Sequence, residues 1–223
     1  MRRDRPALRR PSEPATPPDT AAASSLRYIR ETMARTGTFT AVPGWGGVAM
    51  GATAIGAAVL ASTQPTVSSW LTVWTAEALV GGVIGAWTTW AKARKGGAPL
   101  LSGQGRKFLL GLAPALLVGV ALTLAVYAYE VGPTGEYFAR GGAHDAIASY
   151  RLLPGLWLLL YGAGVTSAGT FSIRLVPLMG TLFMLTGALA LLAPAAWADG
   201  FMALGFGGLH VVFGTLIATR HGG

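Results

Sequence analysis

Six long apolar segments constrain the fold of this chain more than any other feature of its sequence. Each is 18 to 24 residues long, and as a helix rising about 1.5 Å per residue each spans the ~30 Å hydrocarbon core of a bilayer. They lie at residues 45–62, 67–90, 108–129, 152–169, 175–193 and 201–219. The sequence therefore predicts an all-α fold, a six-transmembrane-helix bundle over residues 43–220 with an amphipathic interfacial helix at its amino-terminal side.

The composition argues against a soluble alternative. Only 12% of the residues are charged and 52% are hydrophobic, whereas a soluble domain carries about 25% charged residues. A soluble helical protein with an oversized core would have too few polar residues for its surface. The chain has no cysteine, which excludes disulfides, thiolate metal sites and cysteine nucleophiles.

The basic residues predict the orientation of the spans. All but Arg140 and Arg151 of the 17 Lys and Arg residues precede the first span, lie in the second and fourth connections, or follow the last span. The positive-inside bias then places both termini in the cytoplasm. The arginine-rich start does not predict a cleaved signal peptide, because no apolar core follows it before residue 43.

Two segments precede the first span. Residues 1–24, rich in Arg, Pro, Ala and Thr, lack apolar periodicity and are predicted to form a disordered basic tail. Within residues 25–37, apolar side chains recur at helical spacing, and Arg27, Arg30 and Arg35 take other faces. We expect this amphipathic helix to lie at the lipid interface with its arginines on anionic headgroups. A solvated helix is the alternative.

Small residues spaced four apart predict tight packing between spans. They are Gly47 and Gly51, Gly81 and Gly85, and the series Gly111, Ala115 and Gly119. Such spacing lets helix backbones approach closely where lipid gives no hydrophobic drive to associate. A second pattern, Ser-x-Arg-Leu-x-Pro, occurs at residues 149–154 and 172–177. We interpret it as a helix start with a serine cap and a first-turn proline, and an inverted repeat as the alternative.

Four polar side chains from four spans are predicted to fall at one depth. Glu77 lies ten residues into its span, about 15 Å from the boundary at 1.5 Å per residue. His210, Tyr161 and Thr186 reach a similar level. A lone ionisable residue at the bilayer centre costs roughly 2.5–3.5 kcal/mol. We therefore expect Glu77 and His210 to be neighbours, with Tyr161 or Thr186 completing the hydrogen bonds.

This polar layer has two interpretations. It is either the proton or cation site of a transporter or sensor, or a hydrogen-bonded clamp that fixes the register of the bundle. A neutral Glu77 bonded to a backbone carbonyl is a further structural alternative. The adjacent His144 and Asp145 are too few for a metal site, and no nucleotide-binding loop, serine triad or zincin helix is present. We expect no catalytic residues, no cofactor, no metal and no direct contact with nucleic acid.

Three sequences carry a resemblance. They are Ser-Leu-Arg-Tyr-Ile-Arg-Glu-Thr-Met at residues 25–33, Phe-Thr-Ala-Val-Pro-Gly-Trp-Gly at 39–46 and Gly-Gly-Leu-His-Val-Val-Phe-Gly at 207–214. These residues resemble a group of uncharacterised bacterial six-helix integral membrane proteins, over residues 25 to 220. The resemblance implies the bacterial inner membrane and a gene neighbour encoding a winged-helix transcription regulator. It implies no activity. The final spans are also similar to small six-span stress-response membrane proteins of bacteria.

These observations favour a non-enzymatic membrane protein with a sensing, signalling or structural role. The expected partners are the lipid bilayer, anionic headgroups, a cytoplasmic protein and further copies of the chain. The alternative function is a small proton-coupled transporter that uses Glu77 and His210. An intramembrane enzyme ranks last, because no catalytic constellation is recognisable.

Overall fold

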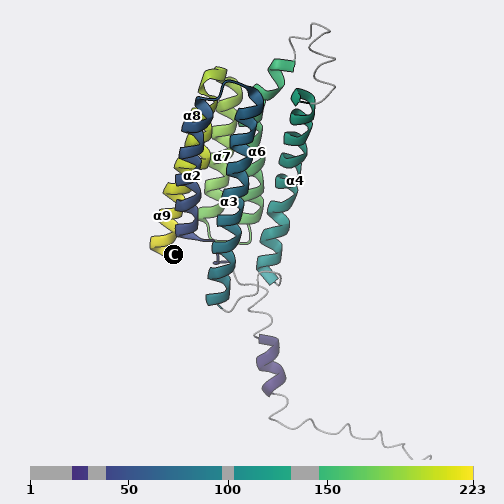
Figure 1. Ribbon diagram of the computed structural model, residues 1–223. Helices are drawn as coiled ribbons and strands as arrows, with labels where there is room; N and C mark the ends of the chain where they lie inside the picture. Colours follow the sequence, from purple (N-terminus) through teal and green to yellow (C-terminus); the bar gives the residue numbers. More distant parts are fainter. Residues whose placement is uncertain (1–21, 30–38, 97–102, 132–145, 223) are drawn as a thin grey trace, which may run out of the picture. The chain divides into compact units, whose positions relative to one another are not determined.

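The computed structural model describes residues 22–29, 39–96, 103–131 and 146–222 (Figure 1). The chain divides into two units, residues 1–37 and 38–223. In the first unit the structure describes one exposed helix at residues 22–29, which begins three residues before the predicted interfacial helix. Arg27 lies on it, exposed, whereas Arg30 and Arg35 lie outside the described residues. Of the tail predicted over residues 1–24, residues 22–24 are helical and residues 1–21 lie outside the described residues.

The second unit contains six helical spans long and apolar enough to cross a membrane. Five are single helices: α2 (Gly44–Ser62), α3 (Val67–Lys95), α4 (Gly103–Val131), α6 (Ala146–Gly169) and α7 (Leu175–Leu192). The sixth is composite, running through η1 (Ala195–Trp197), α8 (Ala198–Met202), the π-helix η2 (Ala203–Leu209) and α9 (His210–His221). The described residues form no named strand, so the predicted all-α, six-span architecture of a multi-pass membrane protein is confirmed.

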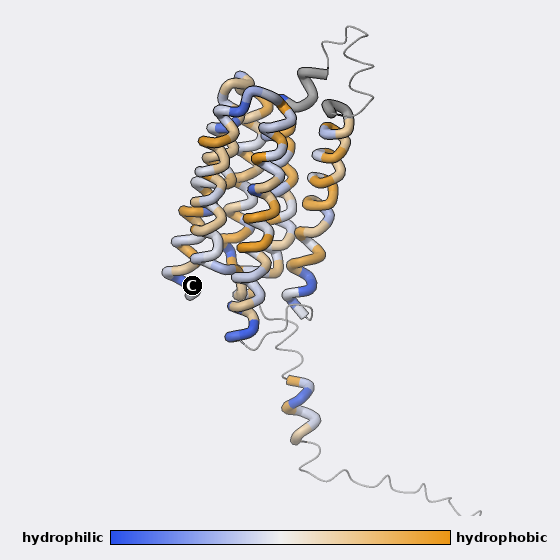
Figure 2. The backbone as a smooth tube through the Cα atoms, viewed as in Figure 1, coloured by the Kyte–Doolittle hydropathy of each residue, from blue (hydrophilic) through white to orange (hydrophobic). Residues whose placement is uncertain are grey.

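Apolar residues run along the spans and hydrophilic residues gather toward the ends of α3 and α4 (Figure 2). The outer faces of these two helices stay exposed, with Leu79 68% and Leu117 68% accessible. In a soluble protein such faces would be costly, because each exposed apolar side chain forgoes the free energy of burial. In a bilayer they are the surface that lipid covers.

The seam between α2 and α9 is built from glycines. A Cβ on Gly51 would lie 2.6 Å from the Gly207 carbonyl oxygen, and one on Gly47 would lie 3.2 Å from Cα of Gly214. Gly44 meets the backbone of Ala218 in the same way. The two helices are thus antiparallel and in backbone contact, as the spacing of Gly47 and Gly51 predicts.

A second glycine seam joins α6 to α7. A Cβ on Gly162 would lie 2.6 Å from the Gly180 carbonyl oxygen, and one on Gly187 would lie 2.8 Å from the Gly155 carbonyl oxygen. On α4, Gly111 approaches the backbone of Ala168 on α6, but Gly119 has nothing within 4 Å of its Cβ position. The predicted packing motif of α4 therefore acts at its first position and not at its last.

Contacts between distant segments tie the ends of the spans together. Lys92, near the end of α3, donates to the carbonyl oxygens of Val42 and His221 at 3.1 Å each, and also to that of Gly222. Beside it, the Phe39 amide donates to the Phe171 carbonyl oxygen at 2.7 Å. We call this side of the bundle the Lys92 end, and the opposite side, which carries α8, the Asp199 end.

The two Ser-x-Arg-Leu-x-Pro sequences are not equivalent helix starts. α6 already begins at Ala146, so Pro154 lies inside the helix rather than in its first turn. Ser172 does not cap α7; its Oγ donates to the Phe39 carbonyl oxygen at 2.6 Å. Only Pro177 lies in a first turn, as predicted. The interpretation of both segments as capped helix starts is therefore wrong.

Candidate functional site

The structure brings Tyr161 and His210 together inside the bundle. Tyr161 Oη on α6 lies 2.8 Å from His210 Nε2, at the start of α9. His210 is buried, with 5% of its surface accessible. Its other ring nitrogen, Nδ1, lies 2.9 Å from the carbonyl oxygen of Phe206 in η2. Both ring nitrogens are therefore occupied by hydrogen bonds.

The hydrogen-bond partners assign the protons of this pair. A carbonyl oxygen can only accept, so His210 Nδ1 carries a hydrogen and donates to Phe206. In a neutral imidazole Nε2 is then an acceptor, and the Tyr161 hydroxyl donates to it. This arrangement satisfies all three groups at once, which is what a buried polar cluster requires.

The π-helix η2 sets the position of the imidazole. The backbone amide of His210 bonds the Gly207 carbonyl oxygen, so its side chain takes the Phe206 carbonyl, four residues back. π-Helical turns are rare and occur frequently at functional sites. Here the glycines that permit close packing also shape the turn: Gly205 lies against Leu158 and Phe183, and Gly207 against Ile55.

Aromatic rings surround the Tyr161–His210 pair. Phe183 of α7, fully buried, has its ring centroid 4.8 Å from that of Tyr161 and 5.3 Å from that of His210. Phe206 packs 5.2 Å from Tyr161 and 6.3 Å from the imidazole. These rings pack the space around the polar atoms with hydrocarbon.

The predicted Glu77–His210 pair is not formed. Glu77 Oε1 accepts from the hydroxyl of Thr53 on α2 at 2.8 Å, whereas both nitrogens of His210 bond to Tyr161 and Phe206. Thr186 is buried, but its hydroxyl donates to the Leu182 carbonyl oxygen of its own helix at 2.8 Å. Of the four residues predicted for one polar layer, hydrogen bonds join only Tyr161 and His210.

Glu77 instead lies at the seam between α2 and α3. It is half-buried, and within the described residues its hydrogen bonding is confined to Thr53. The Thr53 hydroxyl also lies 2.9 Å from the Met50 carbonyl oxygen, although it has a single proton to donate. If Glu77 carries a proton, the acid donates to Thr53 and Thr53 donates to Met50, and every contact is satisfied.

Sequence reasoning missed a polar cluster at the Asp199 end. Asp199 Oδ1 accepts from the indole nitrogens of Trp70 at 2.8 Å and Trp74 at 3.1 Å. Trp157 stacks on Trp70 with centroids 5.7 Å apart and planes 1° from parallel, and its indole donates to the Thr123 hydroxyl at 3.0 Å. The cluster joins α3, α4, α6 and α8. The spacing of Trp70 and Trp74, one helical turn apart, was the available signal.

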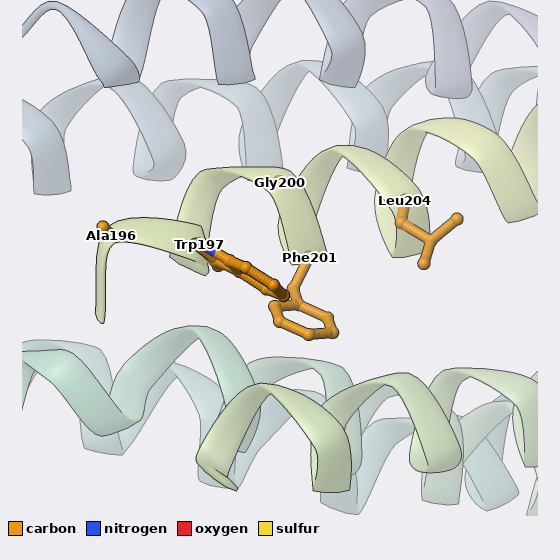
Figure 3. Close-up of a pocket in the computed structure, with 5 residues that line it drawn as sticks. All are labelled: Ala196, Trp197, Gly200, Phe201 and Leu204. Atoms are coloured by element: carbon orange, nitrogen blue, oxygen red, sulfur yellow. The ribbon is translucent and has the colours of Figure 1, made fainter. Parts of the chain in front are cut away.

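The described residues contain no group of three His, Asp or Glu side chains that could hold a metal, and His144 and Asp145 lie outside them. An open surface hollow of about 350 Å³ lies along η1, α8 and the start of η2, lined by Ala196, Trp197, Gly200, Phe201 and Leu204 (Figure 3). Its lining carries no ionisable side chain, so it offers no acid–base chemistry.

Comparisons with known proteins do not extend this account. No protein-family model, curated protein or solved structure matches the chain.

Proposed function

We propose that this chain is a non-enzymatic protein of the bacterial inner membrane that senses or signals by holding another transmembrane segment against its α2–α3 face. One observation carries the proposal: Glu77, in the middle of a span, is half-buried and hydrogen-bonded to Thr53 alone within the described residues. A carboxyl at membrane depth needs partners for both oxygens. The partner we expect is a helix presenting a hydrogen-bond donor at the same depth.

The surroundings of Glu77 favour a helix as that partner. Positions beside the pair are small or open: Gly56, three residues after Thr53 on α2, has nothing within 4 Å of its Cβ position, and Gly81 lies one turn after Glu77 on α3. Val80, three residues after Glu77 and on the same face of α3, is exposed. Small residues permit close backbone approach, and a polar group adds an interhelical hydrogen bond. The partner is a further copy of the chain or another membrane protein.

The Tyr161–His210 pair supports a structural role in this function. Its three polar groups satisfy one another and aromatic rings surround them. We propose that it fixes the register of α6 and α9, so that the α2–α3 face is presented by a rigid scaffold.

A second candidate function, proton-coupled transport, is favoured by the Thr53 contacts. One Thr53 proton faces three acceptors, the Ala49 and Met50 carbonyls and Glu77 Oε1, and a protonated Glu77, which donates to Thr53, leaves that proton to the backbone carbonyls. In this version Glu77 alone, and not a Glu77–His210 pair, holds the transported proton. A carbodiimide that modifies protonated intramembrane carboxyls would label Glu77 in a pH-dependent manner and abolish transport.

The charge distribution supports an orientation with the Lys92 end in the cytoplasm. Seven basic residues lie there in the described part of the chain: Lys92, Arg94, Lys95, Arg106, Lys107, Arg174 and Arg220. The positive-inside bias then places the amino-terminal helix and the carboxyl end on the cytoplasmic side. We propose a cytoplasmic protein partner there, for which the winged-helix regulator implied by the resemblance is the first candidate, and anionic headgroups as the ligands of Arg27, Arg30 and Arg35.

Photocrosslinking in intact membranes tests the helix-binding function. A photoreactive amino acid at Val80, beside Glu77, should give a discrete crosslinked protein, and one at Leu189, an exposed position on α7, should not. Glu77→Leu should remove the Val80 product, while Glu77→Gln, which keeps an acceptor, should retain most of it. Products that form equally at both positions, or survive Glu77→Leu, would overturn the proposal.

A further inference from the structure

Four basic residues lie where α3 ends and α4 begins. Arg94 and Lys95 occupy the last turn of α3, Arg106 and Lys107 the first turns of α4, and all four are exposed. The two helices meet there because Ala93 and Phe108 pack into one apolar cluster with Phe39. We call these four residues the basic quartet.

Two members of the quartet are held by aromatic rings. The guanidinium carbon of Arg94 lies 4.7 Å from the ring centroid of Trp90, and Lys107 Nζ lies 5.6 Å from that of Phe171. Cation–π contacts of this kind restrict long side chains without neutralising their charge. A fifth cation nearby, Lys92, does not belong to the quartet, because its ammonium group donates to three backbone carbonyl oxygens.

The described part of the chain supplies no anion to the quartet. Its acidic residues are Glu77 in the middle of α3, Glu130 at the opposite end of α4, and Asp199 in α8. Four cations at two neighbouring helix ends therefore present a concentrated positive field. The ligand that matches this field is an anion that the described part of the chain does not supply.

Apolar surface adjoins the quartet along both helices. On α3, Val83 is 69% and Trp87 64% exposed, about three and two turns before Arg94. On α4, Leu109 and Leu110 lie two and three residues after Lys107 and are exposed. A ligand bound by the quartet would thus place its anionic part on the cations and an acyl part along these side chains. The ring centroids of Trp87 and Trp90 lie 5.2 Å apart. Tryptophan is typical of the headgroup level of a membrane.

We infer that the basic quartet binds the phosphate diester headgroup of an anionic phospholipid, with Arg94 and Lys95 on one side and Arg106 and Lys107 on the other. Because the quartet spans the connection between α3 and α4, bound lipid would hold α4 against α3. This inference uses neither Glu77 nor Thr53, so it stands or falls separately from the proposed function.

Lipid-dependent thermal stability of the full chain in detergent tests the inference. Phosphatidylglycerol should raise the melting temperature more than phosphatidylcholine, and soluble glycerol phosphate should not raise it, because it lacks the acyl part. The double variant Arg106→Gln/Lys107→Gln should shift the half-saturating phosphatidylglycerol concentration upward, by about five-fold for each charge removed. Stabilisation by glycerol phosphate equal to that by the lipid would overturn the lipid assignment.

A matched control separates a site from a general surface charge. Arg220, on α9 at the same end of the bundle, is exposed and lies outside the quartet. Arg220→Gln should leave the half-saturating concentration within about two-fold of the parent value, whereas Arg106→Gln should raise it about five-fold. Equal shifts for the two single variants would mean that only the net charge matters, and would overturn the proposed site. Both comparisons require variants whose melting temperatures without lipid match that of the parent.

Discussion

The hydroxyl of Tyr161 lies 2.8 Å from Nε2 of His210 and joins α6 to the start of α9. The opposite side of the same imidazole is fixed by the Phe206 carbonyl oxygen at 2.9 Å. Because the tyrosine, the imidazole and the carbonyl are each satisfied, this buried pair needs neither water nor an ion. It therefore specifies which faces of the two helices meet.

The Tyr161–His210 hydrogen bond should appear as an energetic coupling. A double-mutant cycle with Tyr161→Phe and His210→Leu should give a coupling of about 0.5–1.7 kcal/mol, the range seen for hydrogen bonds between membrane helices. The measurement is reversible unfolding of the four proteins in mixed micelles. A parallel cycle of Tyr161→Phe with Thr186→Val should be additive, since Thr186 bonds within its own helix. Additivity in the first cycle would contradict the assigned bond.

The sequence predicts a membrane depth for each polar residue, but it does not predict which side chains are its partners. Counting at a fixed rise along a helix gives depth directly. Which residues touch depends on how each helix is rotated about its axis, and that rotation is set by packing. The packing of α3 against α2 turns Glu77 toward Thr53. In η2 the π-helical turn places His210 against Tyr161.

Residue spacing also predicts which glycines can pack, whereas helix packing decides which of them meet a neighbour and which distant side chains bond to Asp199. Spacing identified Gly47 and Gly51 as packing positions, and both meet α9 or η2. It gave the same signal for Gly119, whose Cβ position has no atom of the described residues within 4 Å. Nothing local in the sequence indicates that the Asp199 carboxylate accepts from Trp70 and Trp74, more than 120 residues earlier.

Thr166 and Thr123 should respond oppositely to the same substitution. The Thr166 hydroxyl is buried against the α6–α7 seam and has no hydrogen-bond partner in the described part of the chain. Thr166→Val should therefore leave stability unchanged or raise it by up to about 1 kcal/mol, because an unpaired polar group is replaced by an isosteric methyl. Thr123→Val should cost about 1–3 kcal/mol, because it removes the acceptor of the Trp157 indole. A loss of stability from Thr166→Val equal to that from Thr123→Val would contradict this account.

Removing the Asp199 carboxylate should weaken the Asp199 end of the bundle. Asp199→Leu leaves two indole N–H groups without an acceptor, and we expect a loss of about 2–4 kcal/mol. Asp199→Asn keeps a carbonyl oxygen at the same place and should retain most of that stability. Tryptophan fluorescence during unfolding follows the change directly, since Trp70, Trp74 and Trp157 all belong to the cluster. Equal losses for Asn and Leu would mean that charge, and not hydrogen bonding, is what matters.

Two glycines on α2 offer the sharpest test of the backbone seam. A Cβ on Gly51 would lie 2.6 Å from the Gly207 carbonyl oxygen and 2.9 Å from the Val211 amide nitrogen, whereas Gly56 has nothing within 4 Å. Because those neighbours are backbone atoms, α2 and α9 can accept a methyl at residue 51 only by separating.

Gly51→Ala should therefore cost about 1–3 kcal/mol through overpacking. Gly56→Ala should be neutral or stabilising by up to about 1 kcal/mol. Both variants gain the same helix propensity, but only the methyl at residue 51 meets a neighbouring helix. Unfolding in micelles that keep the chain monomeric measures both, so that a partner helix on the α2–α3 face does not affect the Gly56 result. If the two substitutions were equally tolerated, the α2–α9 seam would be looser than a direct backbone contact, and His210 would lose the support that holds it against Tyr161.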